Sequence, residues 1–309
     1  MKPRVILGAS ALFLPMAVAG FAQQPAPKNP QDTGAHAESY GKTRDQCFIH
    51  DKSDVIGAHV QSPSGEKLGK IEDVVLDNND GTVAYAVLSY GGILGMGDKL
   101  FAVPWDILTP VHEPKEDHPY FVMPVDKEQL KQSPGFPKDN WPDLDSEWAK
   151  SIHGFYAKTG VKGDEIAPGK VISDTAKLHL LKLDDLKGCN VKTSDDAKAG
   201  EINDVAIDLN RGRVAYVVLA SGGVLGFGTD KYAVPFEALT FSVDKDKDLQ
   251  CQLKVPKAKF EKAPAFESFK TASDQPFVER VYTYYGYPFY WTGATESSMG
   301  KEQAKSKEQ

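Results

Sequence analysis

Hydrophobic residues along the chain follow a pattern that occurs twice. Residues 54–105 and residues 185–236 align at a constant offset of 131 positions without a gap, and 24 of the 52 aligned positions are identical. With one residue removed from a loop, the match continues through residues 130–136 and 260–266. A repeated unit of more than 80 residues is too long for a solenoid repeat. The chain is therefore predicted to hold two tandem domains of one fold.

Within each copy the pattern predicts β-strands. In the first copy, β-branched and aromatic residues at 71–76 and 83–87 flank the polar run 77–81, whose Asn, Asp and Gly residues favour a hairpin turn. Several short strands in so small a unit favour a compact barrel, because closure of a sheet removes its exposed edges. The expected fold class is mainly β, with two tandem small antiparallel β-barrels, each followed by a short helix.

Each copy is predicted to end in an amphipathic helix. Apolar residues spaced by three or four positions mark one helix face, and an acidic residue before them supplies an N-cap. In the first copy these residues are Leu144, Trp148, Ile152 and Phe155, with Asp143 or Asp145 as the cap. In the second copy they are Phe277, Val281 and Tyr284, with Asp274 as the cap, Pro276 in the first turn and Gly286 as the stop.

The one long apolar run of the sequence lies at its N-terminus. Lys2 and Arg4 precede the uncharged segment 5–19, which is followed by small residues and then by a polar stretch rich in Gln and Pro. This order is typical of a secretory signal peptide, and the run is shorter than the ~20 residues of a membrane-spanning helix. We expect residues 1–22 to be removed, leaving no transmembrane span. With no cell-wall anchor in the sequence, we expect export to the periplasm of a Gram-negative bacterium.

The remaining segments are distinguished by composition and charge. Residues 23–44 and 293–309 contain too few apolar groups to fold and are predicted to form a disordered leader and tail. Residues 157–176 form a linker rich in Gly, Pro and Lys, which places the two domains at 45–156 and 177–292. The 309 residues include 43 acidic and 36 basic ones, and the net charge of −7 argues against binding to nucleic acid.

Three cysteines, Cys47, Cys189 and Cys251, allow at most one intrachain disulfide. The favoured interpretation is that they are buried and unpaired, because a free cysteine packs as a small hydrophobic residue. If a disulfide forms, Cys189 with Cys251 is the candidate pair, since both lie in the second copy. No C-x-x-C motif or neighbouring histidine indicates a zinc site.

An ordered motif in both copies resembles the PRC-barrel family. In the first copy it is carried by Asp54, Gly57, Val60, Gly69, Ile71, Asp73, Val74, Asp77 and residues 91–104. In the second copy it is carried by Asp185, Gly188, Val191, Gly200, Ile202, Asp204, Val205, Asp208 and residues 222–235. The resemblance implies a small, mostly antiparallel β-barrel that serves as a docking module, and it implies no shared catalytic activity.

Repeated acidic residues form the first candidate binding site. Asp73 and Asp77 in the first copy are matched by Asp204 and Asp208 in the second. Four positions apart on a strand, the members of each pair point to one face, which is compatible with acid–base chemistry or with binding of a ligand or cation. Because they flank a hairpin, where Asp commonly satisfies turn backbone groups, a structural role is the favoured interpretation.

Three other motifs lack essential features of a ligand site. The Gly-rich segments 91–97 and 222–228 have no P-loop Lys-Ser/Thr, and we interpret them as tight connections between strands. Leu249 and Val255 replace the Gly and Glu that a calcium loop would need after Asp244, Asp246 and Asp248. His112 and His118, with Glu113 or Asp117, have no counterpart in the second copy and indicate at most weak, adventitious metal binding.

The aromatic residues near the C-terminus form the first-choice interaction surface. Tyr287, Phe289, Tyr290 and Trp291 lie beyond the second predicted helix, and exposed aromatic clusters are typical of partner-binding sites. No catalytic or cofactor motif occurs, so no enzyme activity and no cofactor are predicted. We expect an exported binding or scaffold protein that docks to an envelope protein or membrane-associated complex. The alternative is a periplasmic protein that binds a small ligand or cation through the matched acids.

Overall fold

The structure is a computed structural model that describes residues 48–90, 99–113, 118–159, 180–222, 229–245 and 248–291. Several segments and residues named in the predictions lie outside the described residues. They are the signal peptide 1–22, the leader 23–44, nearly all of the linker 157–176, the tail 293–309, the Gly-rich segments apart from Gly222, and residues Cys47, Asp117 and Asp246.

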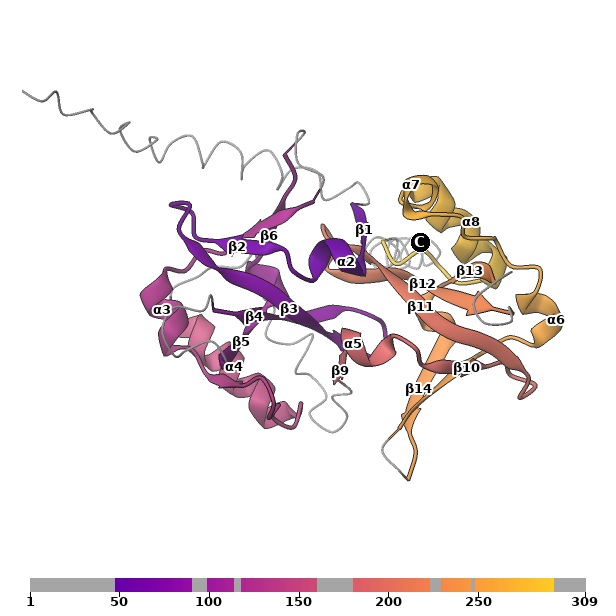
Figure 1. The fold of residues 1–309 in the computed structure, drawn as a ribbon, viewed down its shortest axis with the longest axis horizontal. Coiled ribbons are helices and arrows are strands. Elements are labelled where there is room, and N and C mark those ends of the chain that lie inside the picture. The colour runs from indigo at the N-terminus through magenta and orange to yellow at the C-terminus, as the bar shows by residue number, and fades with distance from the viewer. Residues whose placement is uncertain are drawn as a thin grey trace, which may run out of the picture.

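The first half of the chain forms one sheet with the strand order β6-β7-β2-β3-β4-β5-β8 (Figure 1). Its strands are β2 (His59–Gln61), β3 (Lys67–Asp77), β4 (Val83–Ser89), β5 (Lys99–Pro104), β6 (Thr109–Val111), β7 (Tyr120–Val122) and β8 (Gly135–Pro137). A short 3-10 helix, η1 (Trp105–Ile107), follows β5; the helix α3 (Lys127–Gln132) lies between β7 and β8, and α4 (Ser146–Lys158) follows β8.

The second half repeats this plan with the strand order β13-β12-β11-β10-β15-β14. Its strands are β10 (Asn190–Lys192), β11 (Lys198–Asp208), β12 (Arg213–Ser221), β13 (Asp230–Val234), β14 (Leu239–Val243) and β15 (Leu249–Leu253). Its helices are η2 (Phe236–Ala238), α6 (Lys257–Phe260), α7 (Phe269–Ala272) and α8 (Gln275–Tyr285). The predicted mainly β architecture in two copies is confirmed.

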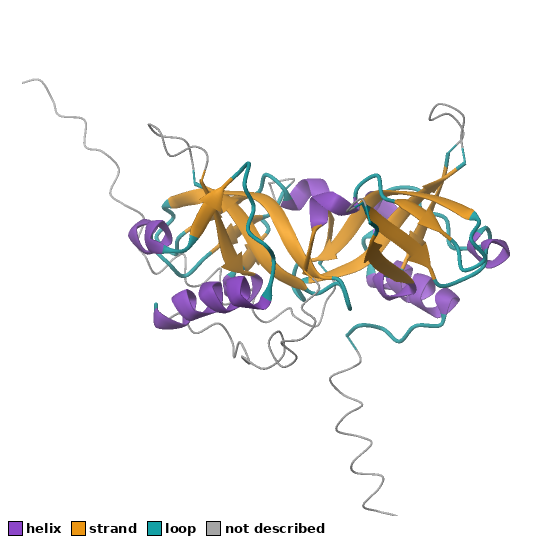
Figure 2. Ribbon diagram, turned by 90° about the horizontal axis from the view of Figure 1, so that it is seen from below, coloured by secondary structure: helices purple, strands orange, loops and turns teal. Residues whose placement is uncertain are grey.

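The ladders are antiparallel except for one pair in each half. β2 pairs with β7 and β10 pairs with β15 in parallel, which the hairpin pattern of the sequence did not indicate. Among the described residues, the first and last strands of each order are not hydrogen-bonded to each other, so each sheet is a partly open barrel. Figure 2 shows the strands of the two halves as two groups side by side, with helices at the outer ends, below the groups and near the point where the groups meet.

The two halves exchange a short strand. β1 (Ile49–Asp51), at the start of the first half, pairs with β11 of the second half, and β9 (Leu180–Lys182), at the start of the second half, pairs with β3 of the first. The two registers are equivalent, because Ile49 lies opposite Asp208 and Leu180 lies opposite Asp77. The helices α2 (Lys52–Val55) and α5 (Leu183–Leu186) follow these strands. The two copies therefore form a pseudo-twofold pair within one chain.

The two hairpin turns also meet at this interface. Thr82 and Arg213, which are equivalent in the two copies, form an antiparallel bridge. The Val83 N–H donates to the Gly212 carbonyl at 2.7 Å, and the Val214 N–H donates to the Gly81 carbonyl at 2.8 Å. The buried apolar residues of both halves form one contiguous cluster. We call the contact formed by β1, α2, β9, α5 and the two turns the interface between the halves.

Two separate features of this interface require glycine in the hairpin turns: the backbone conformation and the close approach of an aromatic ring. Gly212 has a φ of 56° and Gly81 a φ of 76°, a left-handed conformation that L-residues with a side chain rarely adopt. A Cβ on Gly212 would lie 2.4 Å from Cδ1 of Trp105, and one on Gly81 would lie 2.8 Å from Cδ1 of Phe236. Trp105 and Phe236 are equivalent positions of the repeat, so each half packs a buried ring against the turn of the other.

The two C-terminal helices form as the sequence predicts, but their buried faces differ from the predicted ones; in α8, Phe277 and Val281 are buried as predicted, whereas Tyr285 is buried in place of the half-buried Tyr284. Asp145, not Asp143, caps α4 by accepting a hydrogen bond from the Trp148 N–H, whereas Asp274 caps α8 and Gly286 ends it in the left-handed conformation. The buried face of α4 is rotated from the predicted one: its buried residues are Ala149, Ile152 and Tyr156, and Trp148 and Phe155 are half-buried. The sheet surface decides which side of an amphipathic helix is covered.

We predict that Gly212→Ala weakens the interface between the halves. The new Cβ would collide with Trp105 and force a non-glycine residue into a left-handed conformation, at a cost of about 2 kcal/mol or more of unfolding free energy. Denaturant unfolding of the full chain measures this. Gly154→Ala in α4, where a Cβ meets no atom within 4 Å, is the matched control and should be neutral or stabilising. Equal effects of the two substitutions would contradict the packing described.

Candidate functional site

The structure separates the matched acidic residues into different environments. Asp77 closes the hairpin turn, where its carboxylate accepts hydrogen bonds from the backbone and side-chain amides of Asn79 at 2.9 and 2.8 Å. Asp73 lies at a β-bulge of β3 and is 6% exposed. Its Oδ1 accepts from the Val74 N–H at 2.8 Å and from the Asp184 N–H of α5 at 3.3 Å. Each of these carboxyls is thus engaged by backbone donors.

Asp73 caps a helix of the other half. The position before α5 is Lys182, whose side chain makes no capping hydrogen bond, and Asp73 supplies the acceptor across the interface. In the first half, α2 is capped by its own Asp51, which accepts from the N–H groups of Ser53 and Asp54. Burial, with a smaller contribution from the nearby charge of Asp184, raises the pKa of Asp73 to about 6 against the lowering effect of the two backbone hydrogen bonds and of Lys52.

Asp204 and Asp208 also differ from each other. Asp204 is half-buried at the β-bulge equivalent to that of Asp73, where burial raises its pKa although the Val205 N–H donates to it. Asp208 is fully buried. Its carboxylate accepts from the Phe48 N–H, the Arg211 guanidinium and the Tyr290 hydroxyl. Asp208 therefore connects the beginning of the described chain with its end.

The C-terminal aromatic segment, residues 287–291, lies against the second half. Tyr287, Phe289, Tyr290 and Trp291 are all half-buried and pack on the apolar core. The rings of Phe289 and Trp291 stack with centroids 5.1 Å apart. The guanidinium of Arg211 lies 5.7 Å from the Trp291 ring, and that of Arg213 lies 5.6 Å from the Tyr290 ring. The segment is thus anchored on one side and accessible on the other.

Arg213, which contacts Tyr290 of the aromatic segment, is held in place by two ion pairs. The Arg213 guanidinium pairs with Glu237 at 2.7 Å and with Asp80 of the first half at 3.6 Å. The Tyr282 hydroxyl of α8 donates to the other oxygen of Glu237 at 3.0 Å. The aromatic segment, the helix before it and the interface between the halves are therefore linked through Glu237 and Arg213.

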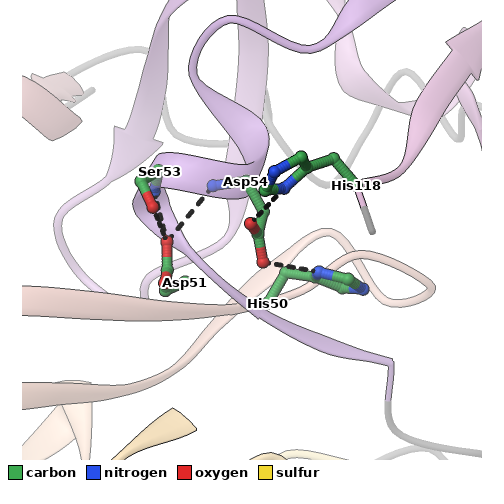
Figure 3. Close-up of polar contacts among 5 residues, drawn as sticks. All are labelled: His50, Asp51, Ser53, Asp54 and His118. Carbon is green, nitrogen blue, oxygen red and sulfur yellow. Dashed lines mark hydrogen bonds and ion pairs between the residues drawn. The ribbon is translucent and has the colours of Figure 1, made fainter. Parts of the chain in front are cut away.

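Two histidines flank one carboxylate in the first half, an arrangement that sequence reasoning missed (Figure 3). Nδ1 of His50 lies 2.9 Å from one oxygen of Asp54, and Nδ1 of His118 lies 2.7 Å from the other. Although burial opposes ionisation of Asp54, the hydrogen bonds and charges of His50 and His118 lower its pKa. The sequence pairs His118 with the nearby His112, and no local pattern indicates its contact with a residue 64 positions away.

Other candidate metal ligands are used in local structure. Within the part of the chain that the structure describes, no group of three or more His, Cys, Asp or Glu residues is arranged to hold a metal ion. The His112 ring packs beside the rings of His50 and Phe48, with centroids 6.1 and 5.7 Å apart. Asp244 accepts hydrogen bonds from the Asp248 N–H and the Gln250 amide, as expected of a residue at a hairpin end.

Cys189 and Cys251 form a disulfide, so the interpretation that all three cysteines are unpaired is wrong. Their Cα atoms are 6.5 Å apart. Cys189 immediately precedes β10, and Cys251 lies in β15, the parallel partner of β10. This strand neighbourhood follows from tertiary pairing between segments 62 residues apart, which the spacing of cysteines in the sequence does not reveal.

Comparison with known proteins identifies the repeated unit. A family model of the PRC-barrel domain matches residues 50–130 and residues 179–249, one segment in each half. No curated protein matches the chain significantly. Among the described residues, no helix has the length and apolar character needed to span a membrane.

We predict that Asp208→Asn destabilises the protein by about 3 kcal/mol, because it leaves the Arg211 guanidinium without its buried counter-charge. It should also increase the solvent exposure of Trp291, measured by fluorescence quenching, since the hydroxyl of Tyr290 loses its acceptor. Asp77→Asn is the control at the equivalent position and should change unfolding free energy by less than about 0.5 kcal/mol. Similar losses of unfolding free energy in both variants would exclude a special role of Asp208.

Removal of the disulfide by Cys189→Ser with Cys251→Ser is expected to lower the unfolding free energy by about 2–4 kcal/mol, because the unfolded chain gains freedom. Thiol titration of the oxidised, unfolded wild-type chain should find one free cysteine, Cys47. A count of three free thiols would show that the bond does not form.

Proposed function

The chain belongs to the PRC-barrel family, and from this premise we propose that it is an exported, non-enzymatic binding or scaffold protein. Its two domains would dock in the periplasm to an envelope protein or membrane-associated complex. The observation that carries the proposal is the C-terminal aromatic segment, which is held in one position by the Tyr290–Asp208 hydrogen bond and by two arginine–aromatic contacts.

A pre-positioned aromatic surface is suited to binding a protein. Aromatic side chains with arginine neighbours dominate the energetics of many interfaces, and a rigid surface loses little entropy when a partner binds. Phe289 and Trp291 are stacked and half-exposed, so a partner would cover an ordered surface. The segment is attached to Asp208 through Tyr290, and the preceding helix α8 is attached to Glu237 through Tyr282; these contacts tie this surface to the interface between the halves.

The acidic residues support a ligand-binding function less well. Asp73 faces the interface between the halves, where backbone N–H groups occupy it, and Asp208 is fully buried. Because these roles already account for the repeated carboxyls, we favour docking over binding of a small ligand or cation. Support for export comes from the signal-like N-terminal sequence together with the Cys189–Cys251 disulfide, a bond typical of oxidising compartments.

In-cell crosslinking followed by mass spectrometry tests the proposal with the full chain. Phe289→Ala with Trp291→Ala removes the outer rings and leaves the Tyr290 anchor in place, and we expect recovery of specific envelope partners to fall at least about tenfold. Trp141→Ala is the control, since Trp141 is a half-buried tryptophan in the first half whose ring is tilted against that of Phe136, with centroids 5.0 Å apart. Unchanged partners in the double variant, or an equal loss in the control, would contradict docking through this segment.

A further inference from the structure

The interface between the halves contains several charges around one buried carboxyl. The Lys52 ammonium of α2 pairs with the Asp184 carboxylate of α5 at 2.6 Å, so this ion pair connects the exchanged helices. Although Lys52 belongs to a surface helix, its side chain is only 13% exposed. Asp73 of β3 lies directly beneath the first turn of α5 and accepts a hydrogen bond from its backbone.

Few charges face Asp73 that would favour its ionised form. From α5 it meets the like charge of Asp184, and from α2 it meets Lys52, whose ammonium is already paired with Asp184. The neighbouring residue on β4 is the apolar Val87. On β9, Lys182 is paired with Asp185 at 3.1 Å. Among the described residues, an ionised Asp73 is therefore buried with no cation paired to it alone, and it lies near Asp184, whose own side chain is 73% exposed.

The second half has a weaker version of the same arrangement. Asp204 faces the like charge of Asp51 and the cations Lys187 and Lys52, and it is half-buried rather than buried. The neighbouring helix α2 is capped by Asp51, and the backbone hydrogen bond that Asp204 accepts comes from Val205 of its own strand. The consequences of proton binding are thus concentrated at Asp73.

We propose that the interface between the halves is acid-responsive: a proton taken up by the Asp73 carboxyl in mildly acidic medium strengthens the attachment of β9 and α5 to β3, and its release weakens that attachment. This inference does not depend on the proposed docking function. Its consequence is that the relative placement of the two barrels is held more firmly in mild acid than at alkaline pH.

The direction of the pH effect on this interface follows from proton linkage. When β9 and α5 separate from β3, water reaches Asp73 and its pKa returns toward 3.8, whereas in the closed interface it is about 6. The closed state therefore binds the proton more tightly, and lowering the pH from 7.5 to 5 should favour closure about tenfold. The added stability of the closed interface is fully present below about pH 4 and is lost as the pH rises through 6.

Amide hydrogen exchange of the full chain tests the proposal. We expect protection factors of the Leu181 and Asp184 amides, corrected for intrinsic exchange, to rise about tenfold between pH 7.5 and pH 5. Asp73→Asn keeps an oxygen acceptor for the α5 backbone but does not titrate, and it should abolish this rise. Asp184→Asn removes the like charge and should move the midpoint to lower pH. Asp77→Asn, on the same strand, should retain the full response.

Four results would overturn the proposal, three from hydrogen exchange and one from NMR. The first is a flat wild-type profile between pH 7.5 and pH 5. The second is a rise that persists in Asp73→Asn. The third is a rise that disappears in His118→Gln, because the contact of Asp54 in α2 with His50 of β1 and with His118 would then account for the response. A carboxyl titration of Asp73 by NMR gives an independent readout, and a midpoint near the ordinary aspartate value would also contradict the proposal.

Discussion

The structure depends on the reciprocal pairing of the two halves around the Thr82–Arg213 bridge. On each side of this bridge, one half lends a three-residue strand to the long strand of the other, and a buried ring covers the opposite turn glycine. Unpaired edges of long strands favour association, and here each edge is covered by the other copy. The contact resembles the isologous interface of a twofold dimer, with both protomers joined in one chain.

Equivalent positions across this pseudo-twofold axis carry different chemistry. Lys182 occupies the place of Asp51, so α5 has no cap of its own and depends on Asp73 from the other half. Arg213 occupies the place of Thr82 and pairs with acids from both halves. Fusion of the copies allows each side of one interface to change separately, which a homodimer does not permit.

Both ends of the described chain meet at one side of this interface. The carboxylate of Asp208 accepts from the backbone of Phe48 and from the hydroxyl of Tyr290, residues more than 240 positions apart. The aromatic segment is therefore positioned by the same strand that receives β1. Any substitution that weakens the interface is expected to alter the position of the proposed docking surface, because Arg213 and Asp208 contact both.

The duplication, the β-rich domains and the two capped helices could be predicted from the sequence, because these depend on periodicity and on local turn and cap chemistry. The sequence also identified the acids, the aromatic segment and the candidate cysteine pair as residues to examine. Only the tertiary structure decided that β1 and β9 are exchanged, that Cys189 and Cys251 bond, and that His118 meets Asp54. These contacts join segments far apart in the chain, and the close approach of such segments depends on how whole sheets pack rather than on any local pattern.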